Sequence, residues 1–267
     1  MTARFEKIAG PPSIAVDVQG DTGSLVLFMH GIGGNRRNWH NQLPAFAGSY
    51  RAVAWDARGY GDSDDYEGAL DFSDFAEDLL RVLDHFGVED AHLVGLSMGG
   101  RIAMDFYDSH PERVRSLVLC DSLPGFESIS EEQRHAFVAS RRDPLLAGQE
   151  LSDIAPVVAK TLVSATASPE IVQQLIDSMS MLRKESYIKA IEGLVFYPKT
   201  AKLEEVRVPT LFLVGSDDRL TPPELSKDMA ARVSGAEYVE IPDAGHLTNL
   251  EKPEIFNRAV LEFLERV

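Results

Sequence analysis

The chain has 267 residues, with 42 acidic side chains against 26 basic ones, so its formal net charge is −16 at pH 7. That length can bury a large core without metals or disulfides, and the charge disfavours nucleic acid and anionic membranes as partners. The only cysteine, Cys120, cannot form an internal disulfide, and no signal sequence or spanning segment is apparent. We therefore expect a soluble, cytoplasmic protein.

Short apolar runs rich in Val, Leu and Phe predict the strands of a mostly parallel sheet, buried on both faces. The runs cover residues 25–29, 52–55, 92–96, 114–120, 210–215 and 238–241. Apolar side chains three and four residues apart predict helices between them, over residues 72–86, 98–109, 223–233 and 253–267. This alternation of strand and helix indicates an α/β class.

The alternation stops between residues 122 and 202, which hold no convincing strand. Four helical patterns occupy this segment instead, over residues 131–140, 154–162, 170–179 and 184–195. The segment has ten acidic and nine basic residues, a net of −1, so the rest of the chain carries −15. We therefore expect an α/β core over 1–121 and 203–267, with a helical cap over 122–202 inserted between strands.

The segment Gly95-Leu96-Ser97-Met98-Gly99 has the form G-x-S-x-G and stands between a predicted strand and a predicted helix. A sharp turn at such a junction holds the serine at strained backbone angles, and the glycines let neighbouring backbones approach closely. This context predicts that Ser97 is a nucleophile. Because a serine hydroxyl is a weak nucleophile at neutral pH, a base and an orienting acid must follow along the chain.

His246 lies in a glycine-containing loop after the last predicted strand and just before the last helix. That place suits the base of a hydrolase whose triad runs in the order serine, acid, histidine. Two adjacent carboxylates, Asp217 and Asp218, follow the strand over 210–215, and the pattern alone leaves both open as the acid. His30, by contrast, is expected to pack against or hydrogen-bond its adjoining loop.

Five segments together resemble the α/β-hydrolase superfamily: HGIGG at 30–34, WDARGYGDS at 55–63, GLSMGG at 95–100, GSDDRLTP at 215–222 and AGHLTNLEKP at 244–253. The resemblance covers the whole chain outside the insert. It implies that Asp218, three residues after the strand-ending glycine, is the acid, with Asp121 as a lesser candidate. It also implies an oxyanion hole formed by the backbone N–H groups of Ile32 and Met98, and structural roles for Asp56 and Arg58.

Within that superfamily the pattern is most similar to 3-oxoadipate enol-lactonases and bacterial carboxylesterases. The resemblance implies a serine hydrolase that cleaves a carboxylic ester or (enol-)lactone through an acyl-enzyme, without a metal or organic cofactor. Three alternatives stay open. They are a carbon–carbon bond hydrolase of aromatic degradation, in which Trp commonly follows the catalytic histidine where this chain has Leu247; a cofactor-free, haloperoxidase-like esterase; and a ligand receptor built on this fold.

Side chains of the helical insert are expected to select the substrate. The apolar candidates for lining its pocket are Phe126, Phe137, Met179, Met181 and Phe196. A carboxylate-bearing substrate would be repelled by the net charge unless a local cation offset it, because like charges slow the encounter. The candidate cations are Arg134, Arg141, Arg142, Lys184 and Lys189, and an arginine could bind a carboxylate through two parallel hydrogen bonds.

Overall fold

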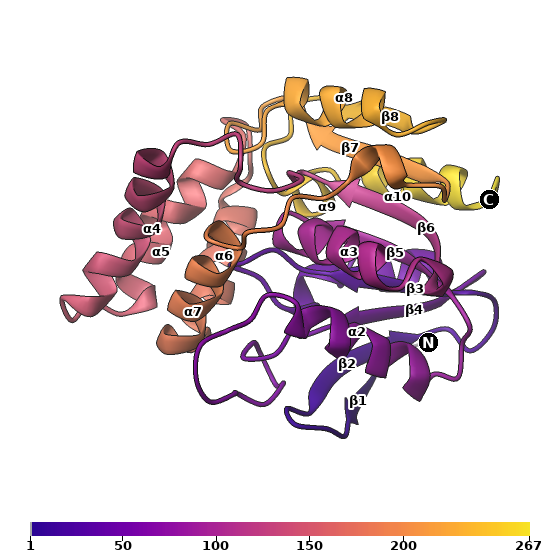
Figure 1. The fold of residues 1–267 in the computed structure, drawn as a ribbon, viewed down its shortest axis with the longest axis horizontal. Helices are drawn as coiled ribbons and strands as arrows, with labels where there is room; N and C mark the ends of the chain where they lie inside the picture. Colours follow the sequence, from indigo (N-terminus) through magenta and orange to yellow (C-terminus); the bar gives the residue numbers. More distant parts are fainter. Residues whose placement is uncertain (1) are drawn as a thin grey trace.

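A computed structural model describes residues 2–267 and is built around one eight-stranded sheet (Figure 1). The strands, in chain order, are β1 Arg4–Ile8, β2 Ile14–Gln19, β3 Leu25–Met29, β4 Arg51–Trp55, β5 Ala91–Leu96, β6 Val114–Cys120, β7 Thr210–Gly215 and β8 Glu237–Ile241. Their order in the sheet is β1-β2-β4-β3-β5-β6-β7-β8. Strands β3 to β8 pair in parallel, which confirms the predicted mostly parallel sheet.

The apolar runs did not predict β1 and β2, which form an antiparallel hairpin at one edge of the sheet. Three of the five side chains in β1 are exposed, so that strand has no apolar run. In β2 the polar Asp17 interrupts the run. Antiparallel edge strands follow weaker hydrophobic patterns than buried parallel ones, and this is why composition identified only the other six.

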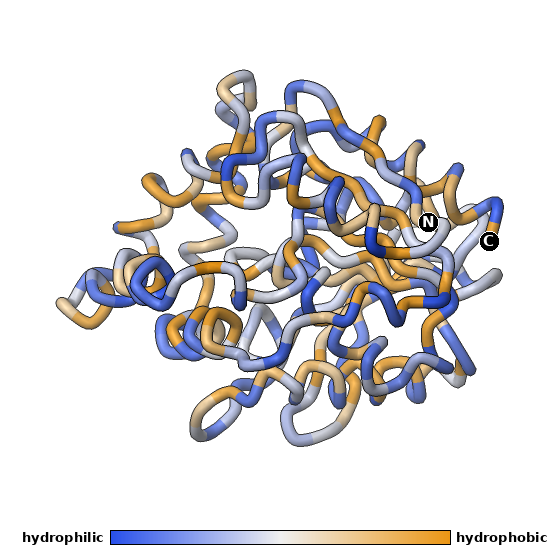
Figure 2. The backbone as a smooth tube through the Cα atoms, turned by 45° about the horizontal axis from the view of Figure 1, so that its top comes forward, coloured by the Kyte–Doolittle hydropathy of each residue, from blue (hydrophilic) through white to orange (hydrophobic). Residues whose placement is uncertain are grey.

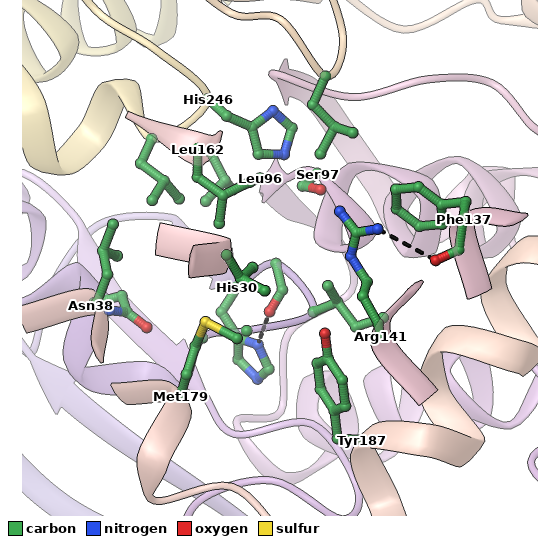
Figure 3. A pocket seen from close by; sticks show the side chains of 18 residues that line it. His30, Asn38, Leu96, Ser97, Phe137, Arg141, Leu162, Met179, Tyr187 and His246 are labelled. Atoms are coloured by element: carbon green, nitrogen blue, oxygen red, sulfur yellow. Dashed lines mark hydrogen bonds between the residues drawn. The ribbon is translucent and has the colours of Figure 1, made fainter. Parts of the chain in front are cut away.

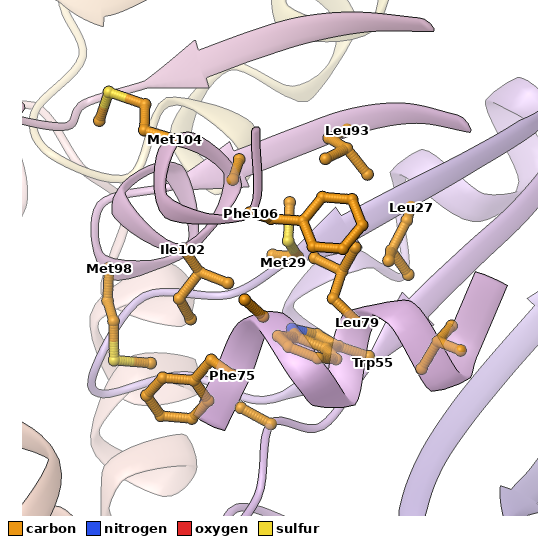
Figure 4. Close-up of a cluster of buried hydrophobic side chains, with 14 of the residues drawn as sticks. Leu27, Met29, Trp55, Phe75, Leu79, Leu93, Met98, Ile102, Met104 and Phe106 are labelled. Carbon is orange, nitrogen blue, oxygen red and sulfur yellow. The ribbon is translucent and has the colours of Figure 1, made fainter. Parts of the chain in front are cut away.

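Helices cover both faces of the sheet. They are α1 Gln42–Phe46, α2 Asp74–His85, α3 Met98–Ser109, α8 Pro223–Arg232, α9 Thr248–Glu251 and α10 Pro253–Leu264. Alternate side chains of each strand join different clusters, since successive residues of a strand point to opposite faces. On one face Leu27 and Leu93 pack with Phe75 of α2 and Phe106 of α3 (Figure 4). On the other, Phe28 packs in a cluster with α1 and α10.

The predicted helical insert forms four helices between β6 and β7: α4 Glu131–Leu146, α5 Leu151–Leu162, α6 Pro169–Ser180 and α7 Lys184–Val195. They lie together beyond the carboxyl ends of the parallel strands (Figure 1). Helix α4 continues to Leu146, past the predicted end at residue 140, and includes Pro144. The division into a core and a cap with the boundaries given above stays a prediction.

Hydropathy follows the same architecture. Hydrophobic stretches run through the interior of the molecule, and many outer turns are hydrophilic (Figure 2). Among the helices of residues 2–267, none combines the length and apolar character that a membrane crossing requires.

Candidate active site

Ser97 occupies a sharp turn between the end of β5 and the first residue of α3. Its backbone angles are φ 53° and ψ −115°, in a region that side chains rarely adopt. A Cβ on Gly95 would lie 2.4 Å from the carbonyl carbon of Gly99, and one on Gly99 would lie 2.2 Å from the Met29 oxygen. Both glycines are therefore required by close backbone approach, as the motif predicted.

Asp218 and His246 form a buried hydrogen-bonded pair. Nδ1–H of His246 donates to Oδ2 of Asp218 over 2.8 Å, and each residue is only 3% exposed. The other carboxylate oxygen, Oδ1, accepts the backbone N–H groups of Leu220 at 2.8 Å and Thr221 at 3.0 Å. A buried carboxylate is costly unless its lone pairs are satisfied, and the turn after β7 supplies the donors.

Thr221 provides a fourth donor that the sequence analysis missed. Its hydroxyl donates to Oδ2 of Asp218 over 2.6 Å and lies 3.3 Å from Nδ1 of His246. Thr221 stands just before the helix predicted over 223–233, but it does not cap that helix: the residue before α8 is Pro222, and no side chain caps it. The sequence did contain a pattern that predicts this bond: a threonine three residues after an aspartate in a turn. Threonine hydroxyls readily form hydrogen bonds with polar groups of the same turn.

Electrostatics in this pair favour a charged imidazolium. Burial would lower the pKa of His246, but the charge of Asp218 and its hydrogen bond outweigh burial and raise the pKa above its usual value. Burial would raise the pKa of Asp218, but the charge and hydrogen bond of His246 lower it. The arrangement therefore makes His246 a stronger proton acceptor than a free imidazole.

The Ser97 hydroxyl and the His246 ring face the same cavity (Figure 3). Within residues 2–267 the hydroxyl makes no hydrogen bond, whereas the Ser97 backbone is held by the Cys120 carbonyl and the Ser122 hydroxyl. Catalytic hydrogen bonds are often formed only when substrate is present. The structure thus places the predicted nucleophile and base together around a space that is open to a ligand.

Two backbone N–H groups close to Ser97 in the chain or in its cavity are free to bind an oxyanion. Neither the N–H of Ile32 nor that of Met98 donates to another residue in the described chain. Met98 is the first residue of α3, where N–H groups lack partners within the helix and the helix dipole favours negative charge. These are the two groups that the sequence resemblance assigned to the oxyanion hole.

The other two candidate acids occupy different environments. Asp121 is fully buried behind the pair, where it accepts the Gly215 N–H at 2.9 Å and the Thr248 hydroxyl at 2.6 Å. Burial, followed by the charge of Asp218, raises the pKa of Asp121. Asp217 is exposed on the turn. Of the three carboxylates, only Asp218 is hydrogen-bonded to His246.

The contacts of His30, Asp56 and Arg58 fit the structural roles expected of them. His30 contacts the Gly31 carbonyl through Nδ1 at 2.8 Å and accepts the Ala57 N–H through Nε2 at 3.1 Å. Asp56 accepts the Arg36 backbone N–H at 2.7 Å and also binds its guanidinium. Arg58 pairs with the buried Asp78 at 2.6 Å. These residues fix the loops around the site.

Two cavities meet at Ser97. One, of about 60 Å³, is lined by His246, Met179, Tyr187 and Arg141 among others. The other, of about 310 Å³, is lined by Phe126, Arg101, Arg134 and Thr221 among others. Ile32, Ser97, Phe137 and Leu220 line both. A substrate bound at Ser97 therefore has separate space on two sides of its reacting bond.

Three of the five predicted apolar pocket residues, Phe126, Phe137 and Met179, line these cavities. Met181 and Phe196 do not, which corrects the expectation for those two. Met181 follows Met179 by two residues, about 200° around a helix, and its side chain is 57% exposed. Phe196 is 37% exposed and contacts the His135 ring, 4.8 Å away.

The five candidate cations also divide. Arg134 and Arg141 each line a cavity. Arg142 pairs with Glu192 at 3.0 Å, and Lys184 pairs with Glu150 at 2.6 Å. Lys189 donates to a backbone carbonyl, that of Tyr66, at 3.1 Å. Only the first two arginines are therefore positioned to meet a substrate at Ser97.

Comparisons with known proteins agree with this fold. A family model described as alpha/beta hydrolase fold matches residues 24–253, so the chain belongs to that family. A 2-hydroxy-6-oxononadienedioate/2-hydroxy-6-oxononatrienedioate hydrolase of Burkholderia vietnamiensis is 33% identical over 92% of this chain and 90% of its own. 3-Oxoadipate enol-lactonase 2 of Acinetobacter baylyi is 27% identical over 93% and 91%. A thermophilic esterase from Thermogutta terrifontis superimposes with a TM-score of 0.90, at 29% identity and 98% coverage of both chains.

Proposed function

We propose that this protein is a serine hydrolase that cleaves a carboxylic ester or lactone through an acyl-enzyme intermediate, with Ser97, His246 and Asp218 as its triad. The observation that carries the proposal is the buried pair of His246 and Asp218, whose ring faces the cavity of the strained Ser97. The esterase and enol-lactonase names of two relatives support the same reaction class.

In the first half-reaction, Oγ of Ser97 attacks the carbonyl carbon while its proton passes to Nε2 of His246. The carbonyl oxygen becomes an oxyanion that accepts hydrogen bonds from the N–H groups of Ile32 and Met98. When the tetrahedral intermediate collapses, the bond to the leaving oxygen breaks and His246 gives that oxygen its proton. The acyl group is then bonded to Ser97, and Asp218 has stabilised the imidazolium throughout.

In the second half-reaction, a water molecule attacks the acyl carbon and transfers a proton to His246. The new tetrahedral intermediate expels Oγ of Ser97, which takes the proton back, and the carboxylic acid leaves. Each step needs only a proton acceptor, a proton donor and two N–H groups. The helices of the insert shape the space that admits the substrate.

The test is hydrolysis of a panel of neutral esters and lactones by the wild-type protein and by Ser97→Ala and His246→Ala variants. Loss of one triad member typically costs on the order of 10⁴-fold in kcat, while circular dichroism should show that both variants stay folded. Retention of a tenth of the wild-type activity by either variant would contradict the assignment. Multiple turnovers per protein molecule would separate an enzyme from a ligand receptor.

Carbon–carbon bond hydrolysis is the second candidate, favoured by the 33% identity to the hydrolase of Burkholderia vietnamiensis. Adding a 2-hydroxy-6-oxo dienoic acid to the panel distinguishes the two reactions. If kcat/KM for this compound exceeds that for every ester and lactone, the second candidate replaces the first. Leu247, which follows His246, argues against it by the sequence pattern described above.

A further inference from the structure

Helix α4 presents one arginine to each cavity and one phenylalanine to both. Arg134, Phe137 and Arg141 are three and four residues apart, which places them on one face of a helix. Arg134 lines the larger cavity, Arg141 lines the smaller one, and Phe137 lines both. In Figure 3, Arg141 extends beside Phe137 toward Ser97. The same helix face thus places a guanidinium on each side of the nucleophile.

Neither arginine has an acidic partner. Within residues 2–267 neither makes an ion pair, whereas Arg142 of the same helix binds both Glu192 and Asp143. Arg141 donates only to the Phe137 carbonyl at 3.2 Å and the Ser140 hydroxyl at 3.1 Å. The buried Nε of Arg134 has no hydrogen-bond partner. Both guanidinium groups therefore retain donors for a ligand.

The charge of the cavity walls is opposite to that of the chain. The described residues lining the two cavities include Arg101, Arg134 and Arg141, but no aspartate or glutamate, although the chain carries a net charge of −16. In the larger cavity Arg101 is 3% exposed; its Nη2 lies 3.9 Å from Oδ1 of Asp105, and its Nη1 lacks a hydrogen-bond partner. Arg134 and Arg141 have no such acidic neighbour. Because partly burying a cation without an anion is unfavourable, a bound anion would relieve that cost.

The position of His246 distinguishes the two sides of the substrate. It must protonate the leaving oxygen, so the leaving group extends into the cavity that His246 lines, which is the smaller one with Arg141. The acyl chain then occupies the larger cavity with Arg134 and Arg101. Phe137, at the boundary of the two cavities, lies between the two arginines in the helix.

We propose that the substrate is a dicarboxylate, with one carboxylate on each side of the bond that is cleaved. Arg141 binds the carboxylate of the leaving group, and Arg134 binds the carboxylate of the acyl chain. The planar guanidinium group matches a carboxylate through paired hydrogen bonds. This proposal rests on the serine hydrolase function proposed above.

Four matched esters test it in the full-length protein. The acyl group is glutaryl or its neutral isostere 5-methylhexanoyl, and the leaving group is glycolate or its neutral isostere isobutanol. Arg141→Gln should raise KM roughly tenfold or more for both glycolate esters and not for the isobutanol esters, because a charge-assisted hydrogen bond is lost. Arg134→Gln should do the same for the glutaryl esters alone. Arg142→Gln, the matched control, should change neither.

The doubly neutral ester, 5-methylhexanoyl isobutyl ester, monitors folding and the proposed function in every variant. If wild type hydrolyses it with dependence on Ser97 but either arginine variant leaves KM for its charged esters unchanged, the dicarboxylate proposal is overturned and the hydrolase proposal stands. A crossed pattern, in which Arg141→Gln affects the glutaryl esters instead, overturns it too. If no ester is cleaved by the wild type, the hydrolase proposal itself fails.

Discussion

The cavities at Ser97 are bounded on one side by loops that follow the strands and on the other by helices of the insert. These two sides differ in how many hydrogen bonds their polar groups already make. On the sheet side, Asp218 accepts four hydrogen bonds, one of them from His246. On the helical side, Arg134 and Arg141 keep unused donors. The sheet side is therefore fixed before a ligand arrives, as a catalytic group requires. In the proposal made above, the helical side is completed by the ligand, and this side therefore sets substrate preference.

The largest expected effect tests the sheet side. Asp218→Asn should lower kcat by about 10⁴-fold, because the amide does not hold His246 in the tautomer that accepts the serine proton. Asp217→Asn is the matched control, one residue away and exposed, and it should stay within about twofold. Steady-state kinetics on a neutral ester decides the matter. Equal effects of the two changes would remove Asp218 from the triad.

A smaller effect tests the donors around the acid. Thr221→Val removes the hydroxyl that donates to Oδ2 of Asp218 at 2.6 Å, and a hydrogen bond to a charged group is worth about 1.5–3 kcal/mol. We expect kcat to fall about tenfold or more, with KM for a neutral ester unchanged. Thr221→Ser keeps the hydroxyl and should restore most of the rate. Failure of serine to do so would show that the hydroxyl alone is not sufficient and that the methyl group is also needed.

The next effect concerns the connection between the two walls. Glu251 accepts the Gly245 N–H at 2.9 Å through Oε1 and the Ser164 N–H at 3.0 Å through Oε2, and the His246 N–H donates to the Leu162 carbonyl at 2.7 Å. Because glutamine has one carbonyl oxygen, Glu251→Gln can keep only one of the two N–H bonds.

We expect Glu251→Gln to reduce kcat about threefold and to lower the free energy of unfolding by about 1 kcal/mol. Steady-state kinetics with a neutral ester measures the change in kcat, and urea unfolding measures the change in the free energy of unfolding. Loss of stability with an unchanged kcat would mean that the helical segment can move without disturbing the histidine loop.

The residues on the sheet side could be predicted from the sequence because they follow directly after strands. Ser97 and the Asp218 and His246 loops come directly after β5, β7 and β8, and the carboxyl ends of parallel strands meet at one edge of a sheet. Strand patterns and turn glycines therefore predicted that Ser97, His246 and an acid after β7 lie close together, whereas the choice of Asp218 over Asp217 came from the family resemblance. The hydroxyl of Thr221 was missed, because its bond depends on how the turn after β7 closes rather than on a periodic pattern.

The helical wall was predicted less completely. Helical spacing identified the four helices, but it did not show which face of each points to Ser97. Met181 and Phe196 were consequently placed at the cavity, although both are exposed. Nothing in the sequence favoured any one of the five candidate cations. In the structure Arg134 and Arg141 line the cavities, whereas the other three, Arg142, Lys184 and Lys189, contact other groups of the chain.

The smallest effect on catalysis is expected at Asp121, where the sheet side carries a buried acid that does not touch His246. Asp121→Asn should leave kcat within about twofold, because the amide oxygen can still accept the Gly215 N–H. A large loss of kcat would instead make Asp121 the functional acid. Its effect on stability should be larger and should depend on pH.

Burial, with the charge of Asp218, raises the pKa of Asp121 above its unfolded value, so the folded protein holds this proton to higher pH than the unfolded chain does. The contribution of the group to stability is full below about pH 4, the unfolded pKa, and is lost as pH rises through the folded pKa. Asparagine cannot ionise and escapes that loss. Urea unfolding should therefore show that the free energy of unfolding of Asp121→Asn, relative to wild type, increases from pH 5 to pH 8. A difference that stays constant over that range would mean that Asp121 is already charged at pH 5 in the folded protein.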